Sequence, residues 1–80
     1  MRQYKLVGSS FNKPCKSFEE SQKELRQLHK ELSAQHFYDM VRFEYYPDGH
    51  KYAGKVSSVY FAYGIHSWRI RLEEVNEEVN

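Results

Sequence analysis

Polar and apolar residues between Ser17 and Gln35 repeat with the period of an α-helix. The apolar positions form one narrow stripe at spacings of seven, three and four: Phe18, Leu25, Leu28 and Leu32. The remaining positions are mostly charged or amide side chains, so we predict a single helix with one buried face. Ser17 and Glu20 have the spacing of a capping box, which places the start of the helix. A coiled coil would need a longer stripe than this one.

Four other stretches alternate between apolar and polar residues, which is typical of β-strands with one buried face. We predict strands at Gln3–Val7, at Val41–Tyr46, from His50 to Tyr63 with a kink at Gly54 or Ser57–Ser58, and at Trp68–Leu72. A polar loop should follow Gly8 as far as Pro14. The segments Pro47-Asp48-Gly49 and Gly64-Ile65-His66 are predicted turns.

This order of elements predicts an α+β fold. A single helix should pack on one face of a mainly antiparallel four-stranded sheet, in the order β-α-β-β-β. The chain of 80 residues allows one domain, which we place at residues 1–72, followed by an acidic C-terminal tail at 73–80. The tail repeats Glu-Glu-Val-Asn, and its last copy resembles the EEVD terminus of cytosolic heat-shock chaperones, with Asn80 replacing the aspartate. We interpret the tail as a solvated end that favours solubility.

The composition of the chain indicates the cellular compartment in which the protein is expected. The N-terminus has no apolar stretch of signal-peptide length, and no apolar run approaches the ~20 residues that span a bilayer. One cysteine cannot form an internal disulfide, so a cytoplasmic protein without a membrane partner is expected. The net charge of +1 favours no class of partner by itself.

Residues suited to catalysis or metal binding are present, but their spacing does not form a known site. His29 and His36 lie seven apart on the predicted helix, about 10 Å along its axis, which is too far for one metal ion. The chain has no C-x-x-C, no G-x-S-x-G and no glycine-rich phosphate loop. We therefore expect no metal, no cofactor and no catalytic residue. The loop around Cys15 is a weak environment for a thiolate, and a reactive thiol is only a minor alternative, in which Lys13, Lys16 and the helix N-terminus would lower its pKa.

A small ribonuclease is the one enzyme for which suitable residues exist. They could serve acid–base catalysis and phosphate stabilisation: Lys51, Tyr60, His66, Arg69 and Arg71. The chain length and strand order resemble, in topology alone, the toxin ribonucleases of antitoxin-controlled pairs, although the second helix of those toxins is missing here. That resemblance implies an RNA substrate, and we rank it third.

Charges separate by predicted face. The outward side of the sheet should carry six cations, Lys5, Arg42, Lys51, Lys55, Arg69 and Arg71, against two acids, Glu44 and Glu73. We predict a partner-binding surface on this side, formed by Arg42, Tyr46, Tyr60, Arg69 and Arg71. Arginine and tyrosine are frequent in protein-interface hot spots. The same residue types also stack on bases and neutralise phosphates in single-strand nucleic-acid platforms.

Function follows from these observations only as an expectation. We predict a small non-enzymatic interaction protein that binds and modulates another protein, of the kind common among phage and mobile-element modulators of host machinery. The alternative is a nucleic-acid-binding regulator that uses the basic, tyrosine-containing sheet face. The sequence pI of about 7.9 favours the protein partner, because nucleic-acid-binding modules usually exceed about 9.

Overall fold

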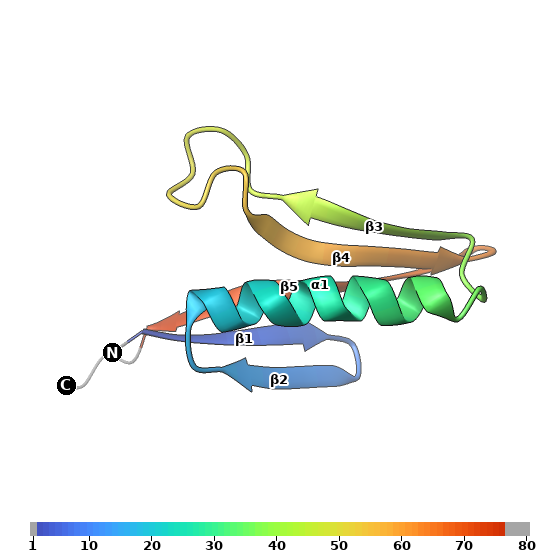
Figure 1. Ribbon diagram of the computed structural model, residues 1–80, viewed down its shortest axis with the longest axis horizontal. Coiled ribbons are helices and arrows are strands. Elements are labelled where there is room, and N and C mark those ends of the chain that lie inside the picture. Colours follow the sequence, from blue (N-terminus) through green and yellow to red (C-terminus); the bar gives the residue numbers. More distant parts are fainter. Residues whose placement is uncertain (1, 77–80) are drawn as a thin grey trace.

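The computed structural model describes residues 2–76 as one helix and five strands (Figure 1). In chain order the elements are β1 (Arg2–Gly8), β2 (Phe11–Cys15), α1 (Phe18–Ala34), β3 (Met40–Tyr45), β4 (Val56–Tyr63) and β5 (His66–Asn76). All neighbouring strands are antiparallel, in the sheet order β2-β1-β5-β4-β3, and α1 packs on one face of the sheet. The α+β class is confirmed. The sheet has five strands rather than four, and the order is β-β-α-β-β-β.

The additional strand is β2, in the segment predicted to be a polar loop. It forms a hairpin with β1 through a turn at Ser9-Ser10, with Gly8 opposite Phe11. Its three middle residues are exposed, so the alternation that marks a strand is missing from its sequence. Pro14 is tolerated because β2 is an edge strand, which pairs on one side only.

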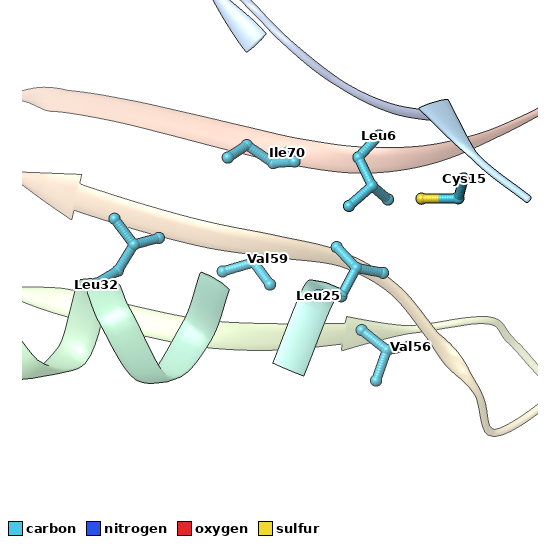
Figure 2. Close-up of a cluster of buried hydrophobic side chains, with 7 residues drawn as sticks. All are labelled: Leu6, Cys15, Leu25, Leu32, Val56, Val59 and Ile70. Carbon is cyan, nitrogen blue, oxygen red and sulfur yellow. The ribbon is translucent and has the colours of Figure 1, made fainter. Parts of the chain in front are cut away.

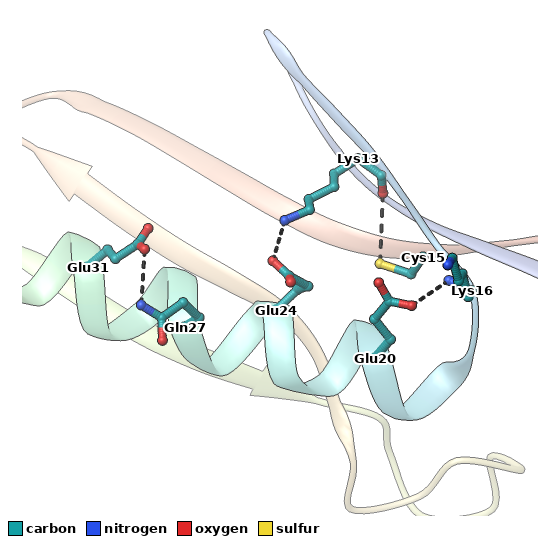
Figure 3. Close-up of polar contacts among 7 residues, drawn as sticks. All are labelled: Lys13, Cys15, Lys16, Glu20, Glu24, Gln27 and Glu31. Atoms are coloured by element: carbon teal, nitrogen blue, oxygen red, sulfur yellow. Dashed lines mark hydrogen bonds and ion pairs between the residues drawn. The ribbon is translucent and has the colours of Figure 1, made fainter.

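The helix has the predicted boundaries, with Ser17 as its N-cap and Gln35 as its C-cap. The Ser17 hydroxyl accepts a hydrogen bond from the Glu20 amide at 3.0 Å. The Glu20 carboxylate accepts from the backbone amide of Lys16 at 2.9 Å, one residue before the cap (Figure 3). The helix is followed by His36, which has a φ of 53°. This left-handed conformation, more usual for glycine or asparagine, turns the chain back toward the sheet.

The segment from Tyr46 to Lys55 is a loop, so the prediction that a strand begins at His50 is wrong. It closes with a hydrogen bond from the Tyr46 amide to the Lys55 carbonyl at 2.9 Å. Gly49 and Gly54 both have positive φ, as turns require.

Strand β4 begins only at Val56. The pairing of β3 with β4 then shifts register. Glu44 lies opposite Ser58 and the next residue lies opposite Val56, so Ser57 is an extra residue.

Strand β5 lies in the middle of the sheet and runs beyond the expected end of the domain. Residues 73–76, which we expected to be tail, pair with Lys5 to Arg2 of β1. Residues 77–80, including the terminal Glu-Glu-Val-Asn, lie outside the described part of the chain. At its start, β5 joins β4 through Gly64-Ile65, with Tyr63 opposite His66. The φ of 59° at Gly64 fits a type II′ hairpin turn.

The core lies between α1 and the sheet. Its buried members are Leu6, Cys15, Leu25, Leu32, Val56, Val59 and Ile70 (Figure 2). Leu25 and Leu32 therefore confirm half of the predicted helix stripe, whereas Phe18 and Leu28 are partly buried at its margin. The core also includes polar residues of the helix, Ser21 and Gln22, which the pattern did not indicate.

No helix among residues 2–76 has the length and apolar character needed to cross a bilayer.

Candidate functional site

The sheet face turned away from α1 carries most of the predicted partner-binding residues. We call it the open face. Trp68, Ile70 and Leu72 of β5 alternate with Arg69 and Arg71, and Ile70 belongs to the core beneath α1. Arg69 and Arg71 therefore project from the open face, where about half of each side chain is exposed (50 % and 56 %). This is the orientation that the alternation predicted.

A row of three side chains crosses the open face from β3 to β5. Arg42 lies opposite Tyr60, and Tyr60 lies opposite Arg69. The Arg42 guanidinium carbon is 4.8 Å from the centre of the Tyr60 ring, and that of Arg69 is 5.4 Å away. Cation–π contacts at these distances hold both guanidinium groups beside one half-buried ring. We call Arg42, Tyr60 and Arg69 the arginine–tyrosine row.

Glu44 anchors one end of this row. Its carboxylate accepts two hydrogen bonds from Arg69, one from Nη2 at 3.0 Å and one from Nε, and a third from the Ser58 hydroxyl. Hydrogen bonds from Arg69 and then Ser58 hold the pKa of Glu44 below its ordinary value. The same pair raises the pKa of Arg69. The paired geometry fixes the plane of the Arg69 guanidinium group.

The neighbouring part of the open face is also charged. Arg71 Nη1 lies 3.4 Å from Glu73, and Lys5 Nζ lies 3.7 Å from the same carboxylate. Arg42 forms no ion pair with any residue between 2 and 76. The strands of the open face thus present four cations, Lys5, Arg42, Arg69 and Arg71, and two acids, Glu44 and Glu73.

Tyr46 does not join the row, contrary to the expected grouping. Its ring stacks on His50 and contacts Tyr52, which itself stacks on Phe18 at the start of α1. Burial, followed by the nearby Glu74 and Tyr4, raises the pKa of Tyr46. The tyrosine is therefore part of an aromatic cluster that attaches the 46–55 loop to the helix side of the molecule.

Lys51 and Lys55 are also absent from the open face. Lys51 pairs with Glu74 at 2.9 Å and lies over the ring of Tyr52. Lys55 instead lines a groove beside α1. Both were assigned to the first part of the strand predicted from His50 to Tyr63, and the structure has the 46–55 loop there. The predicted six cations against two acids on this face are therefore four cations against two acids.

The predicted ribonuclease residues are dispersed. His66 begins β5 and stacks on Trp68, whereas Lys51 contacts Glu74 near the other end of that strand. Eight residues of extended chain separate these two positions by roughly 26 Å. Tyr60, Arg69 and Arg71 lie between them, so the five side chains do not surround one substrate phosphate.

Cys15 lies where β2 meets α1, and it is 4 % exposed. Burial raises the pKa of its thiol, and the charges of Glu20 and Glu24 raise it further. The opposite effect of Lys13 on this pKa is smaller (Figure 3). The raised pKa speaks against the alternative of a reactive thiol. Lys13 does not act mainly on the thiol because its ammonium is 2.6 Å from Glu24, a contact that raises the pKa of Lys13.

A second candidate surface, which the sequence did not indicate, is the groove beside the first half of α1. It has a volume of about 450 Å³ and is lined by Phe18, Glu19, Gln22, Lys23, Arg26 and Lys55. Its cations come from two separate elements, α1 and the 46–55 loop, and only the fold brings them together. Three cations against one carboxylate would suit an acidic group of a partner.

The described residues contain no group of three histidine, cysteine or carboxylate side chains that could hold a metal ion. Comparison of the chain with models of known protein families, with curated proteins and with solved structures found no match.

Proposed function

We propose that the protein is a non-enzymatic interaction module that binds and modulates another protein through the open face of its sheet. The observation that carries this proposal is the arginine–tyrosine row. Tyr60 is held between two guanidinium groups on an exposed surface that no other element of the described chain covers. Tyrosine and arginine are the residue types that dominate binding energy at protein interfaces.

The mixture of charges on the open face favours a protein over a nucleic acid. Glu44 and Glu73 lie among the arginines and pair with Arg69 and Arg71. A phosphate backbone would be repelled by these carboxylates, whereas a protein surface can present cations to them. A nucleic-acid partner remains the second candidate because Tyr60 and its flanking arginines could stack on a base and neutralise phosphates.

The test begins with capture of partners from cell lysate, with and without nuclease, and identification by mass spectrometry. The affinity of the purified partner is then measured for two variants with the same change of charge. Arg69→Glu with Arg71→Glu alters the open face, and Lys23→Glu with Arg26→Glu alters the groove beside α1. We expect the first pair to weaken binding by about tenfold or more and the second to leave it nearly unchanged. Circular dichroism establishes that both are folded.

The opposite ranking of these two variants would move the interface to the groove and overturn the proposal. Tyr60→Ala gives a second measure that leaves the Glu44–Arg69 pair in place, and it should also weaken binding by about tenfold. The salt dependence separates the two partner classes. A protein partner should show a shallow dependence, whereas a nucleic acid should show a steep logarithmic loss of affinity with salt.

A further inference from the structure

The two edges of the sheet differ in how well they are protected. Strand β2 is short and contains Pro14, which cannot donate a backbone hydrogen bond to another strand. Strand β3 at the opposite edge has six residues, Met-Val-Arg-Phe-Glu-Tyr, without proline or lysine. Within residues 2–76, no other strand lies beside its outer side (Figure 1). Every second residue of β3 therefore directs its backbone N–H and C=O away from β4.

Exposed apolar side chains lie at both ends of this edge. Met40 is 45 % exposed and Tyr45 is 58 % exposed, whereas Val41 and Phe43 between them are half-buried. An unprotected edge with exposed apolar ends can accept a further strand. The charges on β3, Arg42 and Glu44, then determine which strand fits.

We propose that β3 pairs with β3 of a second copy of this chain, in an antiparallel register whose two-fold axis passes through Phe43. Residues directly opposite each other in an antiparallel pair lie on the same face of the sheet. Two symmetric registers, with the axis at Arg42 or Phe43, therefore keep five of the six residues of β3 paired, and an axis at Glu44 keeps three.

Charge complementarity selects one of these registers. An axis at Arg42 places that arginine against its own copy, and an axis at Glu44 places two carboxylates together. An axis at Phe43 instead places Arg42 against the partner's Glu44 twice, by symmetry. Arg42 is the cation of the open face that forms no ion pair with a described residue, so it is available for this contact.

The same register also matches the apolar residues on the helix side. Phe43 lies against the partner's Phe43, and the exposed Tyr45 covers the partner's half-buried Val41. Both helices then lie on one side of a ten-stranded sheet, and the two open faces form one continuous surface. The interface goes beyond the proposed partner-binding function and does not depend on it.

The test uses charge exchange between two variants. In Arg42→Glu, two carboxylates would face each other across the interface, and in Glu44→Arg, two guanidinium groups would do so. Each variant alone should dimerise about tenfold more weakly than the unmodified protein, because two cross-strand pairs change from attraction to repulsion. An equal mixture of the variants restores both pairs, so a heterodimer of near-original affinity is expected. Sedimentation velocity measures the unmodified protein, each variant and the mixture.

The control is Arg71→Glu, which makes the same change of charge on the open face but on the central strand β5, and it should leave dimerisation unchanged. If Glu44→Arg does not fold, because Glu44 also holds Arg69, Arg42→Glu is compared with Arg42→Lys, which should retain the dimer. An unmodified protein that stays monomeric at about 1 mM would overturn the proposal. Folded variants whose mixture associates no better than either alone would also overturn it.

Discussion

The side-chain amide of Gln22 satisfies both backbone groups of Val56. Its Nε2 donates to the Val56 carbonyl at 2.8 Å, and its Oε1 accepts from the Val56 amide at 3.0 Å. The glutamine is 5 % exposed and lies next to the position where Ser57 interrupts the β3–β4 ladder. The pairing of β4 with β5 starts only at Ser58, so the Gln22 amide satisfies both backbone groups of Val56 in place of a neighbouring strand, and it joins the helix to the sheet.

Gln22→Met tests this role, since methionine has a similar volume but cannot pair with the backbone. Two buried groups of Val56 would lose their partners, which should lower the free energy of unfolding by about 2–4 kcal/mol. Gln27→Met is the matched control, because Gln27 lies on the exposed side of the same helix and its side chain bonds that of Glu31. That change should stay within about 0.5 kcal/mol in urea denaturation. Equal losses in the two variants would contradict the role of Gln22.

Glu44 should make stability depend on pH. Its pKa is lower in the folded protein than the ordinary value of 4.5, because Arg69 and Ser58 bond the ionised carboxylate. The ionised form therefore stabilises the fold above that value, and the stabilisation is lost as the pH falls through the lowered pKa. The difference in urea midpoint between the unmodified protein and Glu44→Gln should accordingly shrink from neutral pH to well below 4.5. A difference that stays constant would contradict the lowered pKa.

For some single residues, the sequence pattern alone was sufficient to predict their position in the structure. The Ser17 cap and the outward direction of Arg69 and Arg71 follow from local spacing, and both were predicted. The burial of Gln22 and the raised pKa of Cys15 depend on what packs above them. A local sequence pattern cannot predict this burial or this pKa, because the residues that pack around Gln22 and Cys15 come from distant parts of the chain.

Among the elements, the helix was predicted almost to the residue and β2 was missed. The helix has a cap and a period that are complete within its own sequence. Strand β2 has neither, since an edge strand beside a hairpin turn can be polar at most of its positions. Residues 50–55 of the loop were mistaken for strand because the aromatic residues of this loop pack against α1 instead of joining the ladder.

The last part of β5 is the element whose removal tests the extended strand. Four of the six described β1–β5 residue pairs involve residues 73–76. A chain that ends at Leu72 should therefore lose stability and should expose the β1 amides to hydrogen exchange, while the amides of β3 and β4 stay protected. Glu73→Gln with Glu74→Gln is the control, since it removes the charges but keeps the strand. Unchanged protection of β1 in the truncated chain would mean that this pairing is dispensable.

Across the whole molecule, Cys15 can report on opening of the fold. Its thiol is buried between β2 and α1, and burial raises its pKa, so the folded protein has little exposed thiolate. Labelling with a disulfide reagent should be much slower than in urea-unfolded protein, and its rate should follow the unfolded fraction through the transition. Fast labelling under native conditions would indicate local opening at the β2–α1 junction. Unfolding measured by fluorescence of Trp68 provides the comparison.

The order of strands in the sheet also has a consequence for synthesis of the chain. The central strand, β5, is the last of the described elements to be translated, yet it joins the β1–β2 hairpin to the β3–β4 hairpin. Until β5 emerges from the ribosome, the nascent chain holds two separate hairpins and a helix, and no continuous sheet is available to cover Leu25 and Leu32. Folding of the sheet therefore follows translation of its last strand, and the apolar side of α1 stays accessible to chaperones until then.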